Sequence, residues 1–176
     1  MTQANIILIG MPGSGKSTVG IILAKMLAKD FVDTDVLIQL QEKRTLQDIV
    51  DGDGHMALRA IEERVLLAVN HCHHVIATGG SAAYSRPAML HLKEIGTVVF
   101  LHADLPCLRS RIRNYETRGL AKRPDQTFQD LFEERLALYR QYADITVPCS
   151  SLSQEEVCAE IIRQLDQPLP PSPERT

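Results

Sequence analysis

The 176-residue sequence lacks the features that would direct the chain to a membrane or to a nucleic acid. No apolar run approaches ~18 residues, the length that a helix needs to cross a bilayer. The formal net charge is -3, which gives no support for a general nucleic-acid-binding surface. The N-terminus has no signal layout of basic, apolar and small residues. We therefore expect a cytoplasmic protein that binds neither membrane nor nucleic acid.

Cysteine is scarce, and its spacing gives no metal or redox motif. The four cysteines are scattered without a CxxC pair, which favours reduced thiols over disulfides. One of them lies in the segment His71-Cys72-His73-His74, which invites interpretation as a metal site. Adjacent side chains cannot readily all point at one ion, so we expect structural or solvent-facing roles there.

The residues that are present predict one globular α/β domain. Hydrophobic residues make up 44% of the chain and charged residues 23%, which is an ordinary globular mix. We expect a monomeric single domain over residues 1–167 and a disordered, proline-rich tail at 168–176. Apolar runs alternate with helical patterns, which predicts a parallel sheet covered on both faces. The expected strands are Asn5–Ile9, Phe31–Asp33, Val75–Thr78, Thr97–Leu101 and Asp144–Val147.

The most informative segment is Gly10-Met-Pro-Gly-Ser-Gly-Lys-Ser17, which directly follows an apolar run. It fits the phosphate-loop pattern G-x-x-x-x-G-K-[ST] in full. Its glycines let successive N–H groups point at phosphates, and the next helix offers its positive N-terminus to the same anion. A chance match is the alternative, but strand, motif and helix occur in the order that the mechanism requires. The expected nucleotide-binding residues are Gly13, Ser14, Gly15, Lys16, Ser17 and Thr18.

Two carboxylates follow the second strand, in Asp33-Thr-Asp35. Strand carboxyl ends in an open α/β sheet face the ligand crevice, so both side chains are expected beside the phosphates. One can hold Mg²⁺ together with the Ser17 hydroxyl, and the other can orient a substrate hydroxyl toward the γ-phosphate. The alternative is that one of the pair caps the next helix.

Two further segments point to the same crevice. The strand Val75–Thr78 runs into Gly79-Gly80, where the backbone can approach a ligand closely, although a tight turn would also explain the glycines. A basic, turn-rich stretch at about 113–126 lies between two helices. It predicts a mobile lid over an anionic ligand, and an ordinary solvated loop is the alternative.

These segments together resemble the shikimate kinase family. The resemblance covers roughly Asn5 to Ile162 and also rests on Arg59 with Glu62, Glu134-Arg135 followed by Leu138-Tyr139, and Asp144-Ile-Thr-Val147. It implies a three-layer α/β/α P-loop kinase fold with a five-stranded parallel sheet, a lid and a helical substrate-binding region. It also implies transfer of the γ-phosphate of ATP, with Mg²⁺, to a hydroxyl of a small anionic hydroxy acid, shikimate first.

The resemblance assigns roles to individual residues. Lys16, Asp35 and Arg118 are the expected catalytic residues, Ser17 and Asp33 the metal ligands, and Arg111 the residue that packs on adenine. The expected acceptor-binding residues are Asp35, Arg59, Gly79, Gly80 and Arg135. A planar arginine fork suits a carboxylate independently of any resemblance. Arg59 and Glu62 could instead form a surface pair one helical turn apart.

The chain departs from the family pattern on the acceptor side. Ser81 stands where the family usually has a third glycine, and Val50 and Leu58 stand where it usually has aromatic residues. Gly119 replaces a proline and predicts a looser closing loop. These changes leave open the alternative that the protein is a related kinase for another hydroxy acid, such as homoserine or gluconate. A nucleotide kinase and a non-catalytic nucleotide-binding regulatory protein are the alternatives from other classes.

Overall fold

A five-stranded parallel sheet forms the centre of the protein, described here from a computed structural model for residues 5–112 and 119–167. Its strand order is β2-β3-β1-β4-β5. The strands are β1 (Asn5–Ile9), β2 (Asp30–Asp33), β3 (His74–Ala77), β4 (Gly96–His102) and β5 (Ile145–Pro148). The expected strands and the expected α/β class are confirmed, and strand ends differ from the prediction by at most one residue.

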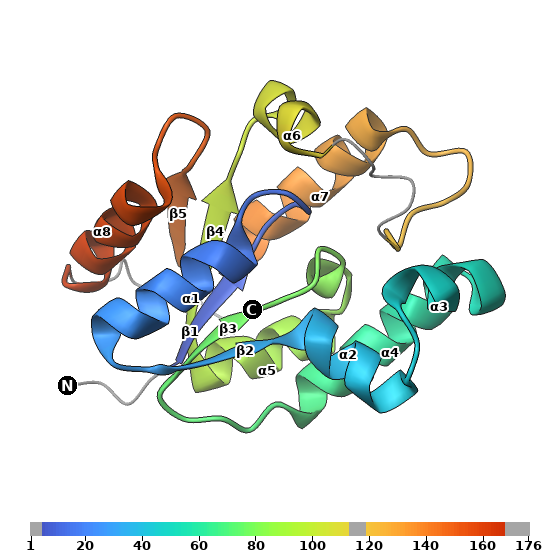
Figure 1. Cartoon of the computed structure of the whole chain (residues 1–176), viewed down its shortest axis with the longest axis horizontal. Coiled ribbons are helices and arrows are strands. Elements are labelled where there is room, and N and C mark those ends of the chain that lie inside the picture. The colour runs from blue at the N-terminus through green and yellow to red at the C-terminus, as the bar shows by residue number, and fades with distance from the viewer. Residues whose placement is uncertain (1–4, 113–118, 168–176) are drawn as a thin grey trace.

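Helices cover both faces of the sheet, as Figure 1 shows. The helices are α1 (Lys16–Leu27), α2 (Thr34–Glu42), α3 (Leu46–Asp53), α4 (His55–Ala68), α5 (Arg86–Ile95), α6 (Leu105–Arg111), α7 (Phe128–Tyr142) and α8 (Gln154–Leu165). Helices α1 and α8 lie on the near face, and α4, α5 and α7 on the far face. Because no face is open to water, all five residues of β1 are buried, which is why this strand reads as a continuous apolar run.

The strand order creates a crevice at the carboxyl end of β1. From β1 the chain first builds β2 and β3 on one side and then β4 and β5 on the other. The helices after neighbouring strands therefore diverge at this point, which is where open α/β sheets bind ligands. The phosphate loop, the end of β2 and the end of β3 all open into this crevice.

At the opposite end of the sheet, the Asn5 side chain ties three segments together. Its amide nitrogen donates to the carbonyls of His71 (2.6 Å) and Ile95 (3.1 Å), and its oxygen accepts from the His74 N–H (2.9 Å). Asn5 is only 2% exposed, so these bonds satisfy polar groups that water does not reach. The His71–His74 segment thus has a structural role.

A second, smaller apolar cluster holds the helical region on one side of the crevice. Its buried members come from α2, α3, α4 and the segment after residue 118, and they are Ile38, Ile49, Leu58, Val65 and Ala121. None of the described helices is long and apolar enough to span a membrane. The predicted tail at 168–176, Arg118 and the first part of the predicted lid lie outside the described residues.

Candidate active site

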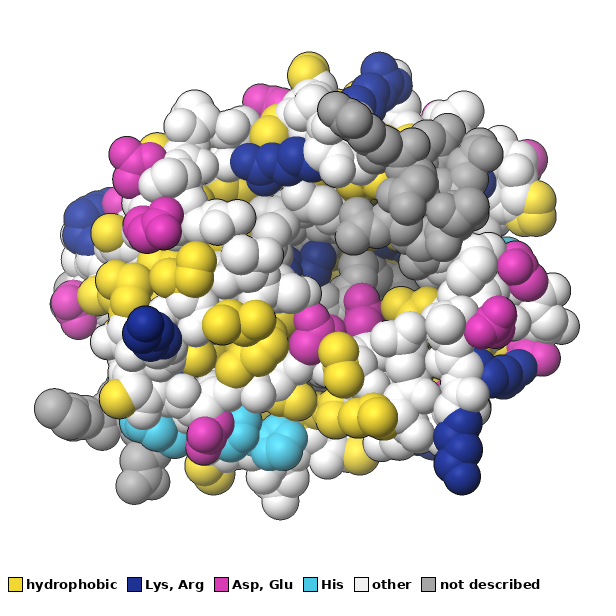
Figure 2. Space-filling model, in the orientation of Figure 1, with side chains coloured by type: hydrophobic (Ala, Val, Ile, Leu, Met, Phe, Trp, Pro, Cys, Tyr) yellow, Lys and Arg dark blue, Asp and Glu magenta, His cyan; other side chains and the backbone are white. Residues whose placement is uncertain are grey.

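A cavity of about 810 Å³ occupies the crevice at the carboxyl ends of the strands. Figure 2 shows it as a hollow with basic side chains inside and acidic side chains on its rim. Its walls come from the phosphate loop, α2, α4, the turn after β3, α7 and the segment that leads into α8. The cavity thereby gathers segments from both ends of the sequence.

The phosphate loop has the conformation that its glycines predict. Gly10, Gly13 and Gly15 have φ of +148°, +82° and +97°, a region that favours glycine. The loop leads directly into α1, so its backbone adjoins the N-terminus of that helix, an arrangement that favours an anion. Lys16 reaches back along the loop and donates to the carbonyls of Gly10 (2.8 Å) and Met11 (3.0 Å).

Lys16 is held in an unfavourable environment for a cation. It is 8% exposed, and burial lowers the pKa of its ammonium from 10.5 to about 8. Asp35 and Asp33 nearby oppose this decrease, whereas Arg135 adds to it. A phosphate group in the cavity would supply the negative charge that Lys16 lacks in the protein alone.

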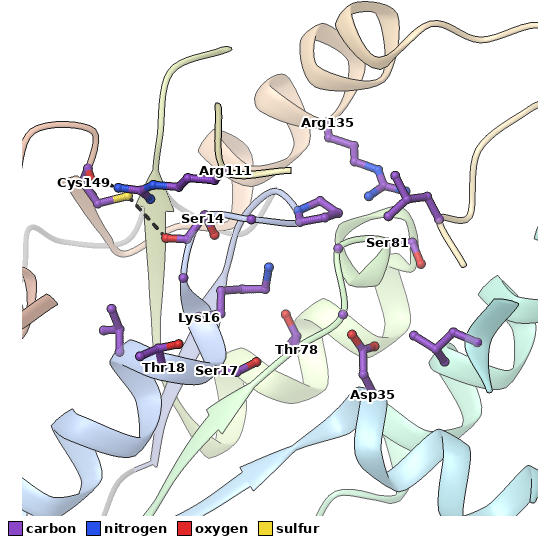
Figure 3. A pocket seen from close by; sticks show the side chains of 18 of the residues that line it. Ser14, Lys16, Ser17, Thr18, Asp35, Thr78, Ser81, Arg111, Arg135 and Cys149 are labelled. Atoms are coloured by element: carbon purple, nitrogen blue, oxygen red, sulfur yellow. Dashed lines mark hydrogen bonds between the residues drawn. The ribbon is translucent and has the colours of Figure 1, made fainter. Parts of the chain in front are cut away.

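The side chains of Ser17 and Asp33 are in contact at the N-terminus of α1, as predicted. The Ser17 hydroxyl donates to Asp33 Oδ2 at 2.5 Å. Asp33 also caps α2, because its Oδ1 accepts from the Asp35 N–H at 2.9 Å. The capping alternative therefore holds for Asp33 at the same time as the contact with Ser17, and it leaves Asp35 to line the cavity (Figure 3).

Gly79 and Gly80 let the backbone after β3 pass between charged side chains. A Cβ on Gly79 would clash with Glu62 Oε1 and would lie 2.6 Å from Asp35 Oδ1. A Cβ on Gly80 would lie 2.7 Å from Arg135 Nη1. Glycine is thus required at both positions because charged side chains approach the backbone closely, and not because the backbone has a special conformation.

Arg135 and Arg59 converge on one carbonyl oxygen. Arg135 Nη2 donates to Ala121 O at 3.1 Å, and Arg59 Nη2 donates to the same atom at 3.2 Å. Arg59 also stacks 3.5 Å from the ring centre of Tyr84. The surface-pair alternative for Arg59 and Glu62 is wrong, because Glu62 is 3% exposed and accepts from the Ser81 hydroxyl.

Four buried side-chain atoms of the described residues have no hydrogen-bond partner. Three belong to residues that line this cavity, and the fourth belongs to Arg59, which lines a smaller neighbouring cavity that shares Glu62 and Ser81 with it. The four atoms are Ser14 Oγ, Arg59 Nε, Glu62 Oε1 and Arg135 Nε. Buried polar atoms without partners are costly, and proteins retain few of them. Their concentration here indicates a site whose polar groups are completed by a ligand.

The predicted adenine contact, Arg111, lies at the far end of the cavity from Asp35 (Figure 3). Its guanidinium donates to the carbonyl of Cys149 at 3.2 Å, and the Cys149 thiol contacts Ser14 O. Sequence reasoning missed Cys149 and the adjoining wall, which is formed by Leu152, Ser153, Gln154, Glu155 and Val157. No motif marks this segment, since its place in the cavity depends on the return of β5 to the sheet.

The residues that depart from the family pattern lie in different parts of the acceptor end. Leu58 and Ser81 line the cavity, whereas Val50 packs against the smaller apolar cluster to which Leu58 belongs. Gly119 has φ of +63°, and its N–H donates to Gln47 Oε1 at 2.7 Å. Proline can neither adopt this positive φ nor donate a backbone hydrogen bond. Gly119 thus anchors this part of the loop to α3.

We expect the substitution Lys16→Met to stabilise the ligand-free fold while weakening nucleotide binding. Between about pH 8 and pH 10.5, Lys16 is protonated in the unfolded chain but neutral in the native protein. Burying the charge therefore costs most below about pH 8, and there the variant should gain ~1–2 kcal/mol of unfolding free energy.

Urea unfolding as a function of pH measures this gain, with the exposed Lys25→Met as the matched control. The gain should shrink as the pH rises toward 10.5. A loss of stability below about pH 8 would contradict the assigned environment of Lys16.

Comparisons with known proteins agree with this geometry. The family model described as Shikimate kinase matches residues 12–166. Shikimate kinase from Sulfurihydrogenibium sp. (strain YO3AOP1) is 36% identical over 162 residues, covering 92% of this chain and 97% of its own. That from Rippkaea orientalis is 37% identical over 174 residues, covering 97% and 92%.

Solved structures give the same result. The shikimate kinase of Acinetobacter baumannii in complex with shikimate aligns with a TM-score of 0.84 at 30% identity, over 93% of each chain. The shikimate kinase of Aquifex aeolicus aligns with a TM-score of 0.78 at 35% identity, over 92% of this chain and 96% of its own. The match extends over both the phosphate loop and the acceptor end of the cavity, and the chain belongs to the shikimate kinase family.

Proposed function

We propose that the protein transfers the γ-phosphate of ATP to a ring hydroxyl of shikimate. The single observation that carries this proposal is the position of the two buried cations, Lys16 on the phosphate loop and Arg135 on the opposite wall. Each lines the same cavity, so one anionic ligand can reach Lys16 while another reaches Arg135. ATP supplies the first anion, and the carboxylate of shikimate supplies the second.

Mg²⁺ belongs to this proposal, and the residues present suit it. Ser17 and Asp33 offer a hydroxyl and a carboxylate oxygen beside the phosphate loop, and Mg²⁺ prefers such oxygen ligands. The described residues contain no cluster of three or more His, Cys, Asp or Glu for a metal, which fits an ion held jointly with substrate phosphates. When bound, Mg²⁺ neutralises phosphate charge.

The chain's own residues perform the remaining work of the transfer. The loop N–H groups and Lys16 hold the phosphates, and Arg111 contacts the nucleotide base. Arg135 and Arg59 orient the acceptor by donating to its carboxylate. The carboxylate thereby replaces Ala121 O, to which both arginines donate in the ligand-free protein. Asp35 accepts a hydrogen bond from the attacking hydroxyl. The new O–P bond forms as the bridging O–P bond of ATP breaks, and the hydroxyl proton passes to Asp35.

Arg118 and the location and assembly of the protein complete the proposal. Arg118 neutralises the transferring phosphoryl group from the lid, as expected of an arginine on a segment between two helices. We also propose that the protein acts as a monomer in the cytoplasm. Lys16, Asp35 and Arg135 line one cavity of a single chain, which supports activity without a second copy.

The proposal is tested by ADP release from ATP and Mg²⁺ with different acceptors. We expect the kcat/KM for shikimate to be at least ~100-fold higher than the values for homoserine, gluconate and nucleoside monophosphates. These other acceptors would leave polar groups of the acceptor pocket unpaired. Better turnover of another acceptor would contradict the choice of shikimate. Nucleotide binding without turnover of any acceptor would favour the regulatory alternative.

The substitution Asp35→Asn should lower kcat by ~100-fold or more, because it removes the proton acceptor while keeping the shape of the side chain. The KM for ATP should change little, since Asp35 lies at the acceptor end of the cavity. Steady-state kinetics with shikimate measure both values, with Asp30→Asn, an exposed residue of the preceding strand β2, as control. A wild-type kcat would remove Asp35 from this role.

A further inference from the structure

Two serine–glutamate pairs connect α4 to the segment after β3. The Ser81 hydroxyl donates to Glu62 Oε2, and the Ser85 hydroxyl donates to Glu63 Oε2. The first pair is buried, since Glu62 is 3% and Ser81 is 7% exposed. Only this inner pair lines the main cavity within the described part of the chain.

The inner pair leaves one carboxyl oxygen of Glu62 without a partner. Ser81 occupies Oε2, whereas Oε1 is buried and makes no hydrogen bond. This oxygen lies against Gly79 at the point that Asp35 Oδ1 also approaches, because a Cβ there would clash with both atoms. Carboxyl oxygens from two different helices therefore approach the same point beside Gly79.

We propose that Ser81 is a positioning residue, whose hydroxyl holds the Glu62 carboxyl so that its other oxygen, Oε1, lies beside Asp35 at the acceptor end of the cavity. The inference rests on the proposed function, in which Asp35 receives the proton of that hydroxyl. Ser81 touches neither nucleotide nor the reacting atoms in this scheme, and it acts through Glu62.

The surroundings of Glu62 give its carboxyl a pH dependence. Burial first, and then the charge of Asp35, raise the pKa of Glu62 from 4.5 to about 7. The Ser81 hydrogen bond, Arg135 on α7 and Lys16 on α1 lower the pKa of Glu62. Tyr139 on α7 also faces the pair, and burial keeps it protonated by raising its own pKa. Loss of the Ser81 hydroxyl should therefore raise the pKa of Glu62 further.

The consequence for activity follows from the shared position of the two carboxyls. Below the pKa of Glu62 its carboxyl is neutral, and a proton on Oε1 can be donated in a hydrogen bond to the Asp35 oxygen that should accept from the substrate. The kcat/KM for the acceptor should therefore fall on the acid side, near the pKa of Glu62. Without the Ser81 hydroxyl, this fall should occur at higher pH.

The first experiment follows the Glu62 carboxyl directly in the ligand-free protein. Carboxyl ¹³C NMR of glutamate-labelled protein should show one group that titrates near pH 7 in wild type and is absent in Glu62→Gln. In Ser81→Ala its titration should move up by roughly one pH unit. An unchanged titration in Ser81→Ala would overturn the inference, and this readout does not depend on which acceptor the enzyme uses.

The second experiment measures the pH profile of kcat/KM for shikimate at saturating ATP. The acid limb near pH 7 should move up in Ser81→Ala, stay in place in Ser81→Thr, and be absent from that pH range in Glu62→Gln. Adding Ser81→Ala to Glu62→Gln should change nothing more, because Ser81 acts through Glu62. Glu63→Gln, in the outer pair, is the matched control and should keep the wild-type profile.

The two experiments separate the two proposals. Additive effects in the double variant, or a wild-type profile for Ser81→Ala, would refute the positioning role. No turnover of shikimate by the wild type would refute the proposed function, and the NMR titration would still decide whether Ser81 controls Glu62.

Discussion

Two buried cations constrain the whole site. Lys16 and Arg135 are 8% and 1% exposed, and burying an ammonium or a guanidinium is costly unless opposite charge compensates it. In the ligand-free protein, carbonyl oxygens provide part of that compensation: Gly10 and Met11 for Lys16, and Ala121 for Arg135. Neither cation has a salt bridge among the described residues, so both are available to pair with an anionic ligand.

The architecture brings these cations to one cavity by the order of its strands. Lys16 follows β1, at the centre of the sheet, and Arg135 lies on α7, which packs behind β4. The glycines after β3 allow the backbone between them to come close to Asp35 and Arg135. A side chain at Gly79 would displace Glu62 or Asp35, and one at Gly80 would displace Arg135 or Pro12. The site therefore depends on small residues as much as on charged ones.

The parts of the site that local sequence determines could be predicted from it. The strands read as apolar runs because helices cover both faces, and the phosphate loop is a contiguous motif with its own backbone geometry. Contacts between distant segments could not be predicted. Ser81 and Glu62 are 19 residues apart, and Arg59 and Ala121 are 62 residues apart. Arg59 and Glu62 therefore suggested a pair with each other, whereas each has a partner on another segment.

The central claim is that the acceptor's carboxylate compensates the buried charge of Arg135. The most direct test is the free energy of unfolding in urea with shikimate and with its methyl ester at equal concentration. A ligand at a hundredfold excess over its Kd stabilises the native state by about 2.7 kcal/mol. The account predicts this gain for shikimate and a much smaller one for the uncharged ester, whereas equal gains for both compounds would contradict it.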